Sequence, residues 1–367
     1  MASSRPTVAL FLAGVVLLAA CGSKKAAAPS VASASVAATA APTTVAPTTS
    51  ALPATTTTAP PPPVAPLTGL PQPDASKLNR PALVVKIDNL DPDARPQTGL
   101  TTADVCFEEQ VEGGITRFAC VWQSRDTGVV GPVRSTRTTD VAIVSELGRP
   151  LYAFSGGNAA FLAAIRAAPI VDVGADAQQG AYYRSGPKQA PHNLFTRVTT
   201  LYGFVPAGAQ PPPPLWPFRP AGTAVTAGGA APITHADLKF PGVGGPTVTW
   251  DWDATSQTWK RGQDGSPDVT TDGGQISAAN VIVQDVDYPV VGYQKEGNLN
   301  SPIPMAQLLG QGDAVILSGG TMVKAHWAKP TATAVTQYTD ANGAPIAMTP
   351  GQTWIELAPL GTPLNTK

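Results

Sequence analysis

Short runs rich in β-branched residues recur along the chain from residue 82 onward, and they predict most of its strands. The run at residues 82–88 is typical of a strand buried in a sheet. It ends in Asp88 and Asn89, so polar groups emerge at the carboxyl end of the strand. Open α/β sheets place their ligands at this edge, and we therefore expect a polar site there.

A β-hairpin is predicted next, with strands at residues 104–111 and 115–123. The three-residue loop 112–114 contains two glycines, as short hairpin loops commonly do. This loop length sets Glu109 opposite Arg117 in the register of the two strands.

The same register sets Cys106 opposite Cys120. Directly opposed antiparallel residues have Cα atoms about 4.5–5.5 Å apart, which a disulfide can span. In an exported protein this predicts a Cys106–Cys120 bridge. Two free buried thiols are the alternative, because Cys also packs well as a small apolar residue.

The pattern then changes to helical spacing. Residues 139–148 predict a helix, with Thr and Asp at its start and Gly at its end. A strand at 151–155, a helix at 159–168 and a strand at 169–173 follow, which together form a βαβ unit.

Alternating and β-branched runs separated by glycine-containing turns predict a second, mainly antiparallel β domain. These runs are residues 247–252, 257–261, 280–284, 314–318, 322–327 and 353–357. The expected fold class is therefore α+β, with an N-terminal α/β domain of mixed sheet and a C-terminal mainly antiparallel β domain. The tryptophans of the second domain are expected to fill a thin core; a stacking surface for sugar rings is the alternative.

Composition divides the chain further. Residues 1–20 carry an apolar run too short to span a membrane, which needs about 20 residues, and typical of a signal peptide. The run ends Leu18-Ala19-Ala20-Cys21, which resembles a bacterial lipobox, so Cys21 is the expected lipidation site. An Ala/Pro/Thr-rich stretch at 21–79 predicts a disordered stalk. A Pro/Gly-rich stretch at 206–232 predicts a linker, or a long ordered loop, between domains at 80–205 and 233–367.

The charge of the chain argues against binding to nucleic acid. The formal net charge is −1 and charged residues make up 13% of the chain, so we expect no nucleic-acid partner. Three Cys and three His leave little material for a metal site, and we expect no metal and no cofactor. The expected location is extracytoplasmic, at the outer face of the cell membrane through lipid on Cys21.

Candidate ligand-binding residues concentrate in the first domain. Arg134 and Arg137 precede a predicted helix, where cations and free backbone N–H groups suit a carboxylate or phosphate. Internal pairing of these arginines with Glu108, Glu112 or Asp140 is the structural alternative. The full ligand-binding set is Asp88, Arg117, Arg134, Arg137, Asn158 and His192. The expected ligand is an anionic cell-wall component or an envelope protein partner.

Two other functions remain open on the sequence. A hydrolase of wall glycan or peptide would use Glu108 and Glu112 as an acid–base pair, with Asp88 as a further candidate carboxylate and His192 as a further base. A purely structural tether would need none of these residues for more than stability.

A series of motifs resembles the DUF3048 family of YerB-like bacterial lipoproteins, from about Arg80 to the C-terminus. The motifs are Arg80-Pro81, Ile87-Asp88-Asn89, residues 94–100, residues 111–117, residues 130–137, residues 155–158 and residues 190–194. The resemblance implies a lipid-anchored envelope protein with an N-terminal α/β domain and a smaller C-terminal domain. It implies no reaction. Cys106 and Cys120 do not belong to this pattern, so their bridge would be particular to this chain.

Overall fold

The computed structural model describes residues 62–296 and 299–367. The predicted signal peptide, Cys21 and most of the predicted stalk lie outside these residues. Within them, the prediction of an α+β fold is confirmed, with far more strand than helix. The described part of the chain contains no helix with both the length and the apolar character needed to cross a membrane.

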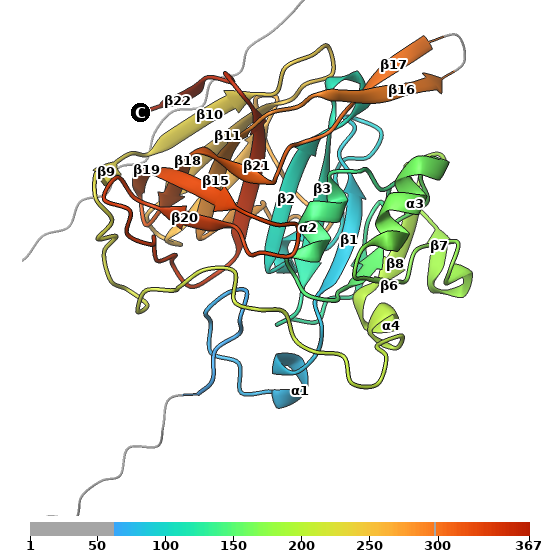
Figure 1. Ribbon diagram of the computed structural model, residues 1–367, viewed down its shortest axis with the longest axis horizontal. Helices are drawn as coiled ribbons and strands as arrows, with labels where there is room; N and C mark the ends of the chain where they lie inside the picture. Colours follow the sequence, from blue (N-terminus) through green and yellow to red (C-terminus); the bar gives the residue numbers. More distant parts are fainter. Residues whose placement is uncertain (1–61, 297–298) are drawn as a thin grey trace, which may run out of the picture. The chain divides into compact units, whose positions relative to one another are not determined.

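Strands from both predicted domains form one mixed sheet of eleven strands (Figure 1). The two halves are joined by a parallel pairing in which Val105 lies opposite Thr353. From one edge to the other the order is β20 (Gln337–Thr339), β19 (Thr321–Lys329), β18 (Gly310–Ser318), β15 (Asn280–Val286), β21 (Thr353–Pro359), β2 (Val105–Gln110), β3 (Thr116–Trp122), β1 (Leu83–Asp88), β5 (Leu151–Ala153) and β6 (Val171–Asp172), with β9 (Ala231–Pro232) beside β19.

A second sheet of six strands is antiparallel throughout. Its order is β13 (Ser266–Pro267), β12 (Thr258–Gln263), β11 (Thr247–Asp253), β10 (His235–Lys239) and β22 (Leu364–Thr366), with β14 (Ser277–Ala278) beside β12. Trp250 and Trp259 of this sheet are fully buried together with Trp354 of β21. These tryptophans therefore fill the core between the two sheets, as expected.

Two small sheets and short helices complete the described part. The small sheets are β4 (Val129–Val130), β8 (Leu194–Arg197) and β7 (Tyr182–Arg184), and the hairpin of β16 (Val290–Glu296) and β17 (Leu299–Pro304). The helices are α1 (Ala75–Leu78), α2 (Asp140–Ser145), α3 (Ala159–Ala167) and α4 (Val198–Tyr202), with 3₁₀ turns η1 (Leu100–Thr102), η2 (Glu112–Gly114) and η3 (Gln179–Ala181). The helix expected at 139–148 is thus shorter than predicted, and the βαβ unit is present as β5–α3–β6, whose strands pair in parallel.

The two faces of the large sheet have different covers, because successive side chains of a strand point to opposite faces. Leu83, Val85 and Ile87 of β1 belong to the core shared with the six-stranded sheet. Val84 belongs instead to the core shared with α2 and α3, which contains Ile143. Figure 1 shows α2 lying over β1 and β3, with α3 to the side of β1. Alternate residues of β1, β2 and β3 therefore face either the six-stranded sheet or helices α2 and α3, and this decides the surroundings of each polar side chain.

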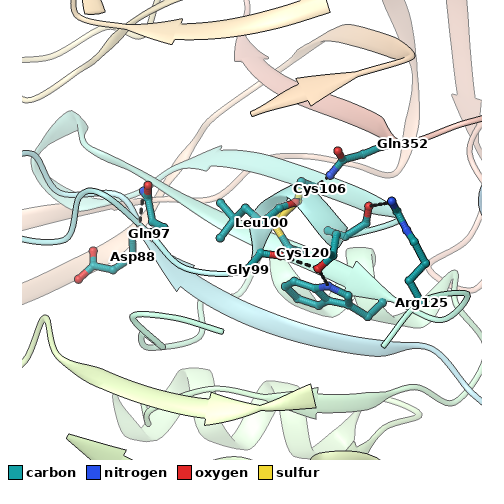
Figure 2. The surroundings of a disulfide bond; sticks show 11 residues. Asp88, Gln97, Gly99, Leu100, Cys106, Cys120, Arg125 and Gln352 are labelled. Carbon is teal, nitrogen blue, oxygen red and sulfur yellow. Dashed lines mark hydrogen bonds between the residues drawn. A yellow bond between two sulfur atoms is a disulfide. The ribbon is translucent and has the colours of Figure 1, made fainter. Parts of the chain in front are cut away.

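The β2–β3 hairpin has the predicted register. Glu109 lies opposite Arg117, and the loop glycines Gly113 and Gly114 have φ values of 77° and 79°, which only glycine adopts readily. Cys106 lies opposite Cys120, and the structure joins them in a disulfide with a Cα–Cα distance of 4.1 Å (Figure 2).

Folded structure begins before the predicted boundary at Arg80. Ala65, Leu67 and Thr68 are completely buried, although they lie in the segment assigned to the stalk. The segment predicted as a linker or a long ordered loop at 206–232 packs on the domain through Trp216, which is 7% exposed.

Candidate functional site

The candidate site lies where two parallel strands end. β1 ends at Asp88, and its parallel neighbour β5 ends at Ala153. The chain segment 131–135 runs alongside, because Arg134 N–H donates to Lys86 O at 2.8 Å and Ser155 N–H donates to Arg134 O at 2.9 Å. This is the edge at which α/β sheets bind ligands.

Asp88 is the centre of the outer part of this site. Its Oδ2 lies 2.7 Å from Nδ1 of His192 and 3.1 Å from Nε of Arg134. The Asp88 side chain is 1% exposed, whereas those of His192 and Arg134 are 14% and 19% exposed. A buried carboxylate thus orients a histidine and an arginine that both reach solvent.

Arg117 lies deeper, beside Asp88 across the β1–β3 pair and beside Glu109 across the β2–β3 pair. Its Nη1 donates to Ser135 O at 3.1 Å. Burial, followed by the charge of Arg137, lowers the pKa of Arg117 to about 10, so the guanidinium stays charged at neutral pH. Its Nε–H has no hydrogen-bond partner among the described residues.

Arg137 pairs with Glu112 of η2. Its Nε and Nη2 donate to the same oxygen, Oε2, at 2.8 and 2.7 Å. The other oxygen of Glu112 has no hydrogen-bond partner in the described part of the chain. The Arg137 guanidinium also lies 5.2 Å from the ring centre of Phe161 in α3, within the range of a cation–π contact.

We call these residues the arginine cluster: Asp88, Glu112, Arg117, Arg134, Arg137 and His192. Five of the six expected ligand-binding residues belong to it, together with Glu112 from the alternative acid–base pair. Internal pairing, the alternative weighed on the sequence, accounts for part of the arrangement. However, the cluster contains three guanidinium groups and only two carboxylates, so it carries an excess of positive charge.

Asn158, the remaining expected residue, has a structural task. It is the N-cap of α3, and its Oδ1 accepts a hydrogen bond from Phe161 N–H at 2.9 Å. It also lines a groove of about 480 Å³ between the start of α3 and the β16–β17 hairpin. Thr138, next to Arg137 in the chain, lines the same groove, so the groove begins beside the arginine cluster.

Glu108 and Glu112 do not come together as an acid–base pair. Strand alternation sends Glu108 to the face covered by the six-stranded sheet, where Arg261 Nη2 donates to its Oε2 at 2.6 Å and Thr116 Oγ1 to its Oε1 at 2.6 Å. Glu112 instead pairs with Arg137. Glu108 and Glu112 therefore have separate cationic partners, Arg261 and Arg137.

A network of charges between the two sheets was not anticipated from the sequence. Arg261 contacts Asp268 as well as Glu108, and Asp268 also pairs with Arg95 at 2.9 Å. Glu108, Arg261 and Asp268 are all completely buried. The only sequence signal was an arginine inside a strand of the second domain.

Glu356 of this network yields a pH-dependent prediction. It lies opposite Glu108 across the β2–β21 pair, and its Oε1 accepts from Trp250 Nε1 at 2.9 Å. Burial, followed by the charge of Glu108, raises the pKa of Glu356 well above its usual 4.5. The folded state therefore keeps a proton that the unfolded chain has released. The contribution of Glu356 to the free energy of unfolding is therefore fully present below the pKa that Glu356 has in the unfolded chain. It decreases as the pH rises above that pKa, by up to about 1.4 kcal/mol per pH unit.

Glu356→Gln is accordingly expected to be more stable than the wild type at neutral pH, because an amide resembles the neutral carboxyl group and needs no proton. Below the unfolded pKa of Glu, the two proteins should approach equal stability. Urea unfolding from about pH 4 to about pH 8 measures this. A stability difference that does not change with pH would contradict the assignment.

Comparison with known proteins gives the relatives of the chain. Residues 67–208 match the N-terminal domain, and residues 237–355 the C-terminal domain, of a family described as "Protein of unknown function (DUF3048)". "Putative lipoprotein YerB" of Bacillus subtilis (strain 168) is 25% identical over 302 residues, which cover 80% of this chain and 86% of that protein. The crystal structure of the YerB protein from Bacillus subtilis matches 82% of this chain and 99% of that chain, with a TM-score of 0.66 at 21% identity. The fold is therefore shared.

Proposed function

This chain belongs to the DUF3048 family of proteins of unknown function, and we propose that it binds an anionic component of the cell envelope at the arginine cluster. The observation that carries this proposal is the gathering of three arginines around two carboxylates: Arg134 pairs with Asp88, Arg137 pairs with Glu112, and Arg117 lies opposite Asp88 within the electrostatic reach of both. Planar guanidinium groups bind carboxylate and phosphate groups through paired, charge-assisted hydrogen bonds.

The distribution of burial supports an external anion. Arg117 is 5% exposed and keeps an N–H without a partner among the described residues. Buried donors are normally satisfied, and an unsatisfied one is costly. An anionic group placed beside the exposed edges of Arg134 and His192 would offset the excess positive charge of the cluster.

The groove beside the cluster suggests a ligand larger than a single ion. It is lined by Thr138 and Asn158 on one side and by Tyr293 and Ile303 of the hairpin on the other. Tyr293 is 62% exposed, so an aromatic ring is available at the groove. An anionic group that belongs to a wall polymer could enter the cluster while neighbouring units lie along the groove.

The proposed location follows from the N-terminal segment. The lipobox-like Leu18-Ala19-Ala20-Cys21 would be lipidated, and the stalk would hold the folded part away from the membrane. Similarity to a protein described as a lipoprotein supports this location. The proposed task is therefore recognition of an envelope component outside the cytoplasm.

The test is binding of the purified protein to wall polymers separated into phosphate-containing and phosphate-free fractions. Arg134→Ala combined with Arg137→Ala is expected to weaken binding at least about tenfold, because charge-assisted hydrogen bonds contribute about 1.5–3 kcal/mol each. Binding should also weaken with added salt.

The matched control is Arg149→Ala combined with Arg166→Ala, which removes the same charge from exposed positions outside the cluster. This control should bind as the wild type does. Circular dichroism establishes that both double variants are folded. Equal binding by the wild type and the cluster variant would refute the site.

A further inference from the structure

Lys86 occupies an unusual position in the middle of β1. Its side chain is completely buried, on the face of the sheet covered by α2 and α3. Its Nζ contacts a carboxylate oxygen of Glu109 on β2 and donates to Oδ1 of Asp140 at the start of α2 at 2.8 Å. Both carboxylates are completely buried too. A lysine is thus held between two acidic side chains from different elements.

The surroundings of this triad are unfavourable for ions. Val84, Phe107, Ile143 and Tyr152 belong to the apolar core on the same face. Removing an ion from water costs several kcal/mol, which an ion pair recovers only in part. Burial, followed by the charge of Asp140, raises the pKa of Glu109 to about 7. Glu109 therefore keeps a proton below that pH, which leaves Lys86 and Asp140 as the charged pair.

We propose that Lys86 and Asp140 condense to form an intramolecular amide bond, which covalently joins β1 to the start of α2. The Lys86 ammonium transfers a proton to the Asp140 carboxylate, and the neutral Nζ then attacks Cγ of Asp140. The C–N bond forms, the C–O bond to one carboxyl oxygen breaks, and that oxygen leaves as water. One ammonium and one carboxylate become one amide and one water, with no change in oxidation state.

The neighbouring groups suit this reaction. The second oxygen of Asp140, Oδ2, accepts from Arg137 N–H at 2.7 Å and from Thr136 Oγ1 at 3.1 Å. These donors hold the carboxyl group and stabilise the negative charge that develops on its oxygen during attack. Glu109, in contact with Nζ and itself protonated, donates its proton to the leaving oxygen, which departs as water, and takes one back from the attacking amine, so it ends the reaction as it began. Burial keeps water from hydrolysing the product.

The alternative arrangement is an uncondensed ion triad, and intact mass spectrometry separates the two. The measured mass of the wild-type protein is expected to be lower by one water, about 18 Da, than the mass calculated from its sequence with the disulfide formed. Lys86→Arg, Glu109→Gln and Asp140→Ala should each lack this loss. Asp140→Asn should lose ammonia in place of water, about 17 Da, because the amide nitrogen is then the leaving group.

Peptide mapping after reduction locates the bond. Trypsin does not cut before proline, so a condensed Lys86 leaves residues 78–117 uncut and joined to residues 138–166. A free Lys86 is instead cut into residues 78–86 and 87–117. A linkage from Lys86 to Glu109 would lose water within 78–117 alone and would overturn the assignment to Asp140. A wild-type mass without loss of water overturns the proposal altogether, whatever the variants do.

Discussion

Arg261→Met is expected to lower the free energy of unfolding by about 3–5 kcal/mol, because it leaves the buried carboxylate of Glu108 without its cation. Arg261 is completely buried between the two sheets and pairs with Glu108 at 2.6 Å and with Asp268. In the variant, Asp268 still pairs with Arg95, whereas Glu108 has lost the guanidinium group of Arg261. Urea unfolding followed by tryptophan fluorescence is suitable, since the ring of Trp354 lies 5.3 Å from the guanidinium carbon.

Lys260→Met is the matched control for this prediction. Lys260 precedes Arg261 in β12 and is only half-buried, and its side chain points to the opposite face of the sheet. Lys260→Met removes one positive charge and introduces Met, as Arg261→Met does, so only a small change in the free energy of unfolding is expected. If Arg261→Met costs no more than Lys260→Met, the buried network does not hold the two sheets together.

Removal of the disulfide is expected to cost about 3 kcal/mol, mainly because the unfolded chain regains the freedom of the closed loop. The bond links Cys106 to Cys120, which are 14 residues apart, and both are completely buried. Cys106→Ala combined with Cys120→Ala should therefore unfold at a lower urea concentration than the wild type. Alkylation of the denatured protein with and without reductant measures the state of the thiols.

The reduced wild type provides the control for the disulfide prediction. Its stability should fall close to that of the double variant when reductant is added, whereas the double variant should not respond. A wild type that becomes fully reduced without losing stability would show that the packing of the hairpin alone holds these strands together.

Much of the first domain follows from local sequence pattern. The strand ending at Asp88, the hairpin register of Glu109 with Arg117, and the β5–α3–β6 unit all occur as predicted. Each depends on side-chain periodicity and on a loop of a few residues, so the partners are neighbours in the chain. The resemblance to the DUF3048 family is confirmed as well.

The candidate site was predictable only in part. Arg134 and Arg137 stood out because they precede a helix; Arg134 pairs with Asp88, as His192 does, whereas Arg137 pairs with Glu112. Strand alternation already separates Glu108 from Glu109. Nothing local, however, indicates which face a second sheet will cover. The partner of Glu108 is Arg261, 153 residues further along the chain.

The amino-acid sequence by itself determined the strand pattern, the opposition of the two cysteines and the family, because these depend on residues close together in the chain. Only the tertiary structure decided that both halves share one sheet, that Lys86 lies between two carboxylates, and that a groove adjoins the arginine cluster. The physical reason is that pairings between distant segments result from many weak contacts acting together. These pairings therefore cannot be inferred from any single stretch of the sequence.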